Sequence, residues 1–225
     1  MTGTGQETVI PVGFRLAGKV QDLDLEKTFA REAANATWIT TTSGKRWQLL
    51  EPRPELVDFY DIAESLAKIP RFLGHTPGQV YSVAQHCCYV CDRLTLDAKP
   101  WGLLHDAAEA YLNDIPKPLK IAMRILSAPM ADPYSVIEKR TEAAIFAAAG
   151  LGPLEGRIAQ QVKDADIRAY ATEVRDLIPE GPHRHDADGI TPYRTPIAPW
   201  PWPRAADEFL SRCWHLVPGA HHLRS

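Results

Sequence analysis

The chain has 225 residues, of which 45% are hydrophobic and 24% charged, and its formal net charge is −3 at pH 7. This length can form one large domain with a substantial core. The slight negative charge offers no basic surface for nucleic acid, so a nucleic-acid-binding protein is disfavoured. No apolar run is long enough for a transmembrane helix. The N-terminus lacks the charged and apolar regions of a signal peptide, so we expect a cytoplasmic protein without a membrane partner.

The pattern along the chain indicates one helical domain with an extension at each end. Residues 1–36 are interpreted as an N-terminal extension with a short polar helical stretch at 23–34. Residues 37–50 carry β-branched and aromatic residues on both sides of Ser43-Gly44, which predicts a β-hairpin. Helical spacing with plausible caps then predicts helices at 58–67, 82–94, 100–112, 118–126, 134–149, 154–177 and 204–215. We therefore expect a mostly α-helical bundle over 37–216, a Pro-rich surface segment at 179–203 and a C-terminal tail at 217–225.

The segment LLHDAAEAYLNDIPKPLK, which begins at residue 103, concentrates groups that are costly to bury. His105 and Asp106 are adjacent, Glu109 follows one helical turn later, and Asp114 precedes the prolines that end the run. The surrounding residues are good helix formers, so one amphipathic helix is predicted to span 103–112. On such a helix Glu109 is four positions from His105 and three from Asp106, so the three side chains can face one pocket. The alternative is that the His-Asp pair decorates a solvated face.

Three further polar positions lie outside this segment. His86 stands in YSVAQHCCYVC, where apolar neighbours point its imidazole inward. Asp166 stands in VKDADIRAY, whose apolar neighbours favour partial burial, and a buried carboxylate needs a partner. Arg71 stands at a loop edge in IPRFLGHT, where its fixed fork of donors suits a phosphate. Each position alone also fits a structural role, as a satisfied core histidine or an exposed ion pair.

Together these residues predict a metal site. His86, His105, Asp106 and Asp166, brought together from three helices, would form a mixed imidazole and carboxylate site. Such ligands suit a divalent ion of the Mn, Fe, Co, Ni or Zn type with open positions for water, whereas a structural zinc site would more often use thiolates. An open site of this kind beside Glu109 and an arginine predicts metal-activated attack of water on a phosphorus.

The order SVAQH, then LLHDAAEAYLNDIPKPLK, then VKDADIRAY resembles the HD-domain metal-dependent phosphohydrolases over about residues 37–216. It is most similar to their small 5′-deoxynucleotidase branch and the phage or prophage relatives of that branch. The resemblance implies an HD-domain helical fold and one divalent metal ion, with Mg added to the metals above. It places the family's H…HD…D metal ligands on His86, His105, Asp106 and Asp166.

The same resemblance implies roles at the substrate. Glu109 would be catalytic, Asp114 would hold the nucleophilic water and the sugar, and Arg71, fifteen residues before His86, would contact the phosphate. The branch can carry a tryptophan after that arginine to exclude ribonucleotides. Phe72 stands there instead and is expected to contact the substrate with Arg71, but this departure weakens the expectation of a deoxyribose preference.

Two points have alternatives: the role of two lysines that follow the His-Asp pair, and the reaction that the protein catalyses. Lys117 and Lys120 can assist at the substrate, the alternative being solvated lysines beside a helix end. The expected activity is removal of phosphate from (deoxy)nucleoside 5′-monophosphates. The alternatives are a deoxynucleoside triphosphate triphosphohydrolase and a non-catalytic nucleotide-binding HD protein.

Other motifs favour structural interpretations. Cys88 and Cys91 have CxxC spacing, but without a second pair we expect buried free thiols. The alanine-rich run at 143–149 fits a tight core or a homodimer interface, and the core is favoured. A second His-Asp pair, at 185–186, lies among glycines and prolines without helical pattern and is interpreted as solvated.

Overall fold

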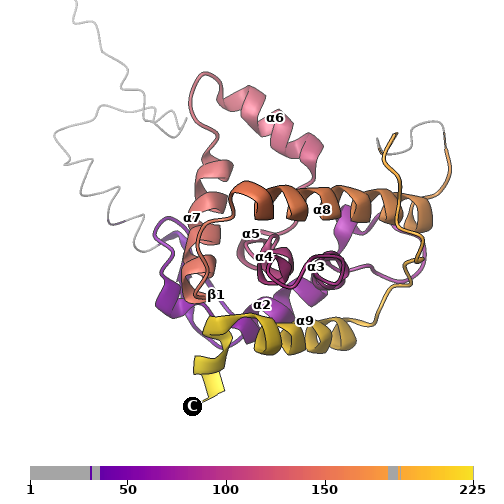
Figure 1. Ribbon diagram of the computed structural model, residues 1–225. Helices are drawn as coiled ribbons and strands as arrows, with labels where there is room; N and C mark the ends of the chain where they lie inside the picture. Colours follow the sequence, from indigo (N-terminus) through magenta and orange to yellow (C-terminus); the bar gives the residue numbers. More distant parts are fainter. Residues whose placement is uncertain (1–30, 32–35, 182–186, 188, 225) are drawn as a thin grey trace, which may run out of the picture. The chain divides into compact units, whose positions relative to one another are not determined.

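The computed structural model describes residues 31, 36–181, 187 and 189–224. The chain divides into two units, residues 1–36 and residues 37–225, and every helix and strand labelled in Figure 1 belongs to the second unit. The helical stretch predicted at 23–34 lies, apart from Arg31, outside the described residues, as does the His-Asp pair at 185–186.

The predicted hairpin is confirmed. Strands β1 (Trp38–Thr40) and β2 (Arg46–Gln48) pair antiparallel, with Ile39 opposite Trp47. Gly44 takes a φ of 81° in the connecting turn, a conformation that glycine adopts without strain. The backbone amide and hydroxyl of Ser43 donate to the buried carboxylate of Asp61 at 2.6 and 2.7 Å, so the turn is attached to the first helix of the bundle.

The remainder is mostly helical, as predicted. The α-helices among the described residues are α2 (Phe59–Lys68), α3 (Val83–Cys91), α4 (Lys99–Leu104), α5 (Glu109–Leu112), α6 (Lys117–Ser127), α7 (Pro133–Ala148), α8 (Gly156–Leu177) and α9 (Trp202–Leu216). Short 3-10 helices are η1 (Pro54–Leu56), η2 (Arg71–Gly74) and η3 (Pro218–Arg224). Three helices start at side-chain caps: Asp58 accepts from the amide of Tyr60, Ser82 from that of Gln85 and Asp132 from that of Tyr134.

Helix α3 lies at the centre of the bundle, in contact with α2, α4, α8 and α9 (Figure 1). All but one of its residues are buried, which explains why most of its side chains are apolar. Helices α2 and α9 pack against each other on one side, where Ile62 and Phe209 are fully buried. Because α3 is enclosed, its one imidazole, that of His86, is completely buried.

The helix predicted over 100–112 is wrong in one respect, because it breaks at the His-Asp pair. Helix α4 ends at Leu104, residues 105–108 form a turn, and α5 begins at Glu109. The Nδ1 of His105 donates to the carbonyl of Gly102, the acceptor that a continuing α-helix would offer to the amide of Asp106. The bonds from Ala107 to Leu104 and from Glu109 to Asp106 are instead three residues apart.

The Pro-rich segment is held across α3 and α8 in its described part. Gln85 of α3 donates to the carbonyl of Ala198 at 2.8 Å and accepts from the amide of Trp200 at 2.7 Å. Thr172 of α8 accepts from the amide of Tyr193 at 2.9 Å. Helix α9 starts at Trp202, two residues earlier than predicted, because a proline is tolerated in the first turn of a helix.

The C-terminal residues do not form a free tail. Val217 and Ala220 are buried in the main core, and the amide of Gly219 donates to the carbonyl of Ala149 at 3.0 Å. The bundle therefore extends past residue 216 into η3.

Within the described part of the chain, the helices all fall short of the length and apolarity needed to cross a bilayer.

Candidate metal centre

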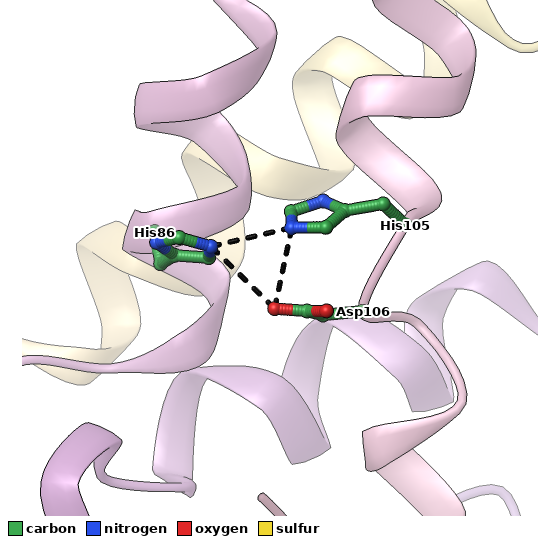
Figure 2. Close-up of side chains that lie close together, drawn as sticks. All are labelled: His86, His105 and Asp106. Carbon is green, nitrogen blue, oxygen red and sulfur yellow. Dashed lines mark hydrogen bonds and ion pairs between the residues drawn. The ribbon is translucent and has the colours of Figure 1, made fainter. Parts of the chain in front are cut away.

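Three of the predicted ligands converge on one point. His86 projects from α3, and His105 and Asp106 project from the turn after α4 (Figure 2). The Nε2 atoms of the two imidazoles are 3.3 Å apart, and Asp106 Oδ2 lies 3.5 Å from the first and 3.3 Å from the second. These side chains can hold a metal ion, because each offers one ligand atom and all these atoms lie within 4.8 Å of one another.

The fourth predicted ligand reaches the same point from α8. Asp166 Oδ1 lies 3.1 Å from His86 Nε2 and 3.8 Å from His105 Nε2. The side chain of His86 is fully buried, whereas that of Asp166 is 38% exposed. The group is therefore closed on the α3 side and open on the side of Asp166.

Both imidazoles are held in the tautomer that a metal requires. His105 Nδ1 lies 2.9 Å from the Gly102 carbonyl, which can only accept, so Nδ1 carries the hydrogen. His86 Nδ1 lies 2.5 Å from Glu173 Oε1, a carboxylate that is completely buried. Each ring therefore carries a hydrogen on Nδ1 and directs Nε2 at the common centre, where a metal ion would replace the Nε2 proton, as in metal-ligating histidines.

The charges around this centre favour a cation. Burial lowers the pKa of the His86 imidazole, and Arg71 lowers it further, but Glu173 and Asp166 outweigh both and raise it to about 9. Burial also lowers the pKa of His105, which Asp106 and Asp166 raise to about 9. Burial raises the pKa of Asp166, yet the two imidazoles hold it well below its usual range. Positive charge at the centre, carried by a proton or by a metal ion, is thus stabilised.

Arg71 stands beside the ligands, as predicted. Its Nη2 donates to Glu173 Oε2 at 3.0 Å, and its Nη1 lies 3.5 Å from Asp106 Oδ2. Its Nε is buried and has no hydrogen-bond partner among the described residues. Burial lowers the pKa of Arg71, but the carboxylates around it, Glu173 first, raise it above its ordinary value. The guanidinium is therefore charged and retains donor capacity.

The residue after Arg71 adopts an unusual backbone conformation. Phe72 and Leu73 take φ values of 55° and 53°, which non-glycine residues rarely adopt. The ring of Phe72 stacks on Tyr170 of α8, with the ring centres 5.9 Å apart. Tyr170 lies one helical turn after Asp166, so this aromatic pair stands next to the ligand group.

The two carboxylates predicted to handle water lie near the ligands. Glu109, only 7% exposed, lines a cavity of about 230 Å³ together with His105 and Asp106. Its Oε2 is buried without a hydrogen-bond partner among the described residues. Burial raises the pKa of Glu109, and Asp106 and Asp114 raise it further. Burial also raises the pKa of Asp114, which Arg71 lowers and Asp106 raises.

The structure separates the two lysines. Lys117 is exposed at the first position of α6, and no contact between it and the ligand group is found in the described part of the chain. Lys120 is partly buried and donates to Glu138 at 2.7 Å. Glu138 lines the same cavity as Glu109, so Lys120 rather than Lys117 lies beside this wall.

Several residues of the site were missed by the sequence analysis. Helix α7 contributes Glu138, Lys139 and Glu142 to the cavity wall, where the four-residue spacing of the two glutamates was the only signal. Glu173 was missed although it lies seven residues after Asp166, and therefore on the same face of α8. The sequence does carry a signal for Glu173. It follows Ala165 and Ala169 at four-residue spacing, so it continues an apolar face of the helix, and all three residues are buried.

The cysteines play no part in the site. All four are free and buried, as predicted, and burial raises the pKa of each thiol. In the described residues, the only group that can hold a metal ion is the one at His86, His105 and Asp106.

No family model matches the chain. The chain is 38% identical over 141 residues to the uncharacterized protein YfdR of Escherichia coli, which covers 63% of this chain and 72% of YfdR. It is also 35% identical over 150 residues to the uncharacterized protein RCAP_rcc00048 of Rhodobacter capsulatus, covering 62% of this chain and 72% of that protein. The chain belongs to the same family as YfdR.

Proposed function

We propose that the chain is an HD-domain phosphohydrolase that removes phosphate from (deoxy)nucleoside 5′-monophosphates with the help of one divalent metal ion. The observation that carries the proposal is the meeting of two imidazole Nε2 atoms and two carboxylates at one point, next to a buried arginine. The resemblance in motif order from SVAQH to VKDADIRAY supports the same class.

The distances between the ligand atoms fit a single cation. Zinc–nitrogen and zinc–oxygen bonds are about 2.1 Å, so ligand atoms around one ion lie about 3.0 Å apart at right angles and about 3.4 Å apart in a tetrahedron. The Nε2 atom of His86 lies 3.1 Å from the carboxylate of Asp166 and 3.5 Å from that of Asp106, which matches these values. Imidazole and carboxylate ligands suit Mn, Fe, Co, Ni or Zn, and Mg remains a candidate. His86, His105, Asp106 and Asp166 would hold the ion.

A divalent ion bound there would supply Lewis acidity, which polarises a phosphate oxygen and lowers the pKa of a water molecule. Arg71 would bind the phosphate through Nη1, which lies 3.5 Å from Asp106. A charged guanidinium stabilises the negative charge that develops on the phosphate oxygens as the bond breaks. Phe72 and Tyr170 would offer an aromatic surface to the nucleoside.

Glu109 would act as the general base. Its buried Oε2 would accept a proton from the attacking water, whose oxygen forms the new bond to phosphorus. The bond between phosphorus and the 5′ oxygen breaks, and the proton passes to that oxygen, so nucleoside and inorganic phosphate leave. Asp114, partly buried near Arg71 and Asp106, would orient the water.

A substrate panel tests the proposal. Mono-, di- and triphosphates of ribo- and deoxyribonucleosides would be incubated with the full chain in Co²⁺, Mn²⁺, Zn²⁺ or Mg²⁺, and the products separated by ion chromatography. We expect inorganic phosphate from the monophosphates and none after chelation. Release of triphosphate would replace the proposal with a triphosphohydrolase, and no turnover of any nucleotide would leave a binding protein.

A further inference from the structure

We infer that Glu173 is a positioning residue that orients a metal ligand and the phosphate-binding arginine at the same time. The inference rests on the proposed function, since it concerns His86 as a ligand and Arg71 as an anion-binding group.

The carboxylate of Glu173 spans both groups. Oε1 lies 2.5 Å from Nδ1 of His86, and Oε2 accepts from Nη2 of Arg71 at 3.0 Å. The side chain is 0% exposed, so both oxygens depend on protein groups rather than on water. A carboxylate that bridges two donors in this way holds both in orientation, because it cannot turn toward one donor without weakening its hydrogen bond to the other.

Each of the two contacts sets a property that function requires. The contact to Nδ1 places the hydrogen on that nitrogen, which leaves the Nε2 of His86 to face Asp166 at 3.1 Å. The contact to Nη2 holds one end of the guanidinium and leaves Nη1 of Arg71, on the side of Asp106, for an anion. Without Glu173, the imidazole can rotate and the guanidinium can pair more closely with Asp106, 3.5 Å away.

Helix α8 carries both Glu173 and the proposed metal ligand Asp166. Asp166 and Glu173 are seven residues apart, which is two helical turns, so they lie on one face of one rigid element. Asp166 approaches the imidazole of His86 at Nε2, and Glu173 approaches it at Nδ1. The helix therefore holds the ring at both nitrogens, and its distal carboxylate reaches on to Arg71.

Two substitutions separate this role from a purely structural one. In Glu173→Gln only one of the two atoms can accept a hydrogen bond, so a partner is lost. In Glu173→Asp the charge stays but the side chain is one methylene shorter and cannot reach both partners. Asp61→Asn is the matched control, because Asp61 is also a buried carboxylate with two hydrogen bonds, made to Ser43 in the hairpin.

The measurements need no turnover. Co²⁺ affinity and the visible spectrum of bound Co²⁺ would be recorded for the full chain and each variant, followed by the affinity for inorganic phosphate at saturating Co²⁺. We expect Glu173→Gln to weaken Co²⁺ binding by about 10- to 100-fold, to alter the Co²⁺ spectrum and to weaken phosphate binding by about tenfold. Glu173→Asp should restore one of the two affinities and not both, and Asp61→Asn should change neither.

The inference is overturned if Glu173→Gln binds both Co²⁺ and phosphate as the wild type does, or if only one of the two affinities falls. A loss of stability with both affinities intact overturns it as well. These outcomes are distinct from failure of the proposed function, which would appear as absence of Co²⁺ binding or of nucleotide hydrolysis in the wild type.

Discussion

The Nε2 atoms of His86 and His105 face each other at 3.3 Å, and each ring donates through its other nitrogen to a fixed acceptor. Two lone pairs at this separation repel each other unless a positive charge lies between them. Asp106 and Asp166 approach the same space with negative charge, at 3.5 and 3.1 Å from His86. The arrangement is thus stabilised when a cation is bound, and binding should stabilise the fold as a whole.

Substitution of His105 with alanine should therefore abolish stabilisation by metal. At a Co²⁺ concentration 100 times its Kd, the wild type should gain about 2.7 kcal/mol in free energy of unfolding, seen as a rise in Tm. His105→Ala removes one ligand of the centre and should show little rise at that concentration. His215→Ala, on the exposed face of α9, is the control and should respond as the wild type does. An equal Co²⁺ response in His105→Ala would contradict the metal centre.

Removal of the general base should leave the metal in place. Glu109→Gln keeps the size of the side chain but cannot accept a proton from water, so kcat should fall by about 10²- to 10⁴-fold. Co²⁺ affinity should change little, because Glu109 is not among the ligands. Glu208→Gln, which removes an ion pair to Arg212 on α9, serves as the control and should retain activity. Full turnover by Glu109→Gln with bound metal would rule out this role.

The pH dependence should report the surroundings of Glu109. Burial, Asp106 and Asp114 raise the pKa of Glu109, whereas Arg71 and Lys120 lower it. A base works only when deprotonated, so kcat/KM should be lost as the pH falls through that raised pKa. Lys120→Gln removes one of the two positive charges that lower the pKa of Glu109. The loss of kcat/KM on the acid side of the pH profile (the acid limb) should therefore move to higher pH.

A second variant on the same helix controls for the change in charge. Arg124→Gln, one turn further along α6, removes an exposed positive charge that is not among the groups acting on Glu109. Its acid limb should coincide with that of the wild type. An unchanged limb in Lys120→Gln would show that Glu109 does not carry the titration.

The candidate ligands could be picked out from the sequence because their types are unusual in their surroundings. His86 has mostly apolar neighbours along the chain, and α3 is buried as those neighbours indicate. The turn at His105 could not be predicted, because leucine and alanine on both sides favour helix. The break depends on a hydrogen bond from the His105 side chain to Gly102, which propensities do not contain.

Glu173 shows a second limit of sequence analysis. It stands just before Arg175 and Asp176, which form an ion pair with each other, so the end of α8 resembles a solvated face. The partners of Glu173 are distant in sequence, since Arg71 precedes it by 102 residues and His86 by 87. Only the fold brings these three groups together. A pattern within one helix can indicate that a carboxylate is buried, but not what it contacts.

The docking of the C-terminal residues gives a prediction about stability. Gly219 packs so closely on α7 that a Cβ atom would overlap the carbonyl oxygen of Ala148, which is backbone and cannot rotate away. Gly219→Ala should therefore displace η3 and lower the free energy of unfolding by about 1–3 kcal/mol, measured by urea denaturation. Gly152→Ala is the matched control, because a Cβ atom there meets nothing within 4 Å. It should leave the stability unchanged or raise it slightly, since alanine restricts the unfolded chain. Coincident denaturation curves for Gly219→Ala and the wild type would mean that residues 217–220 do not pack against the bundle in solution.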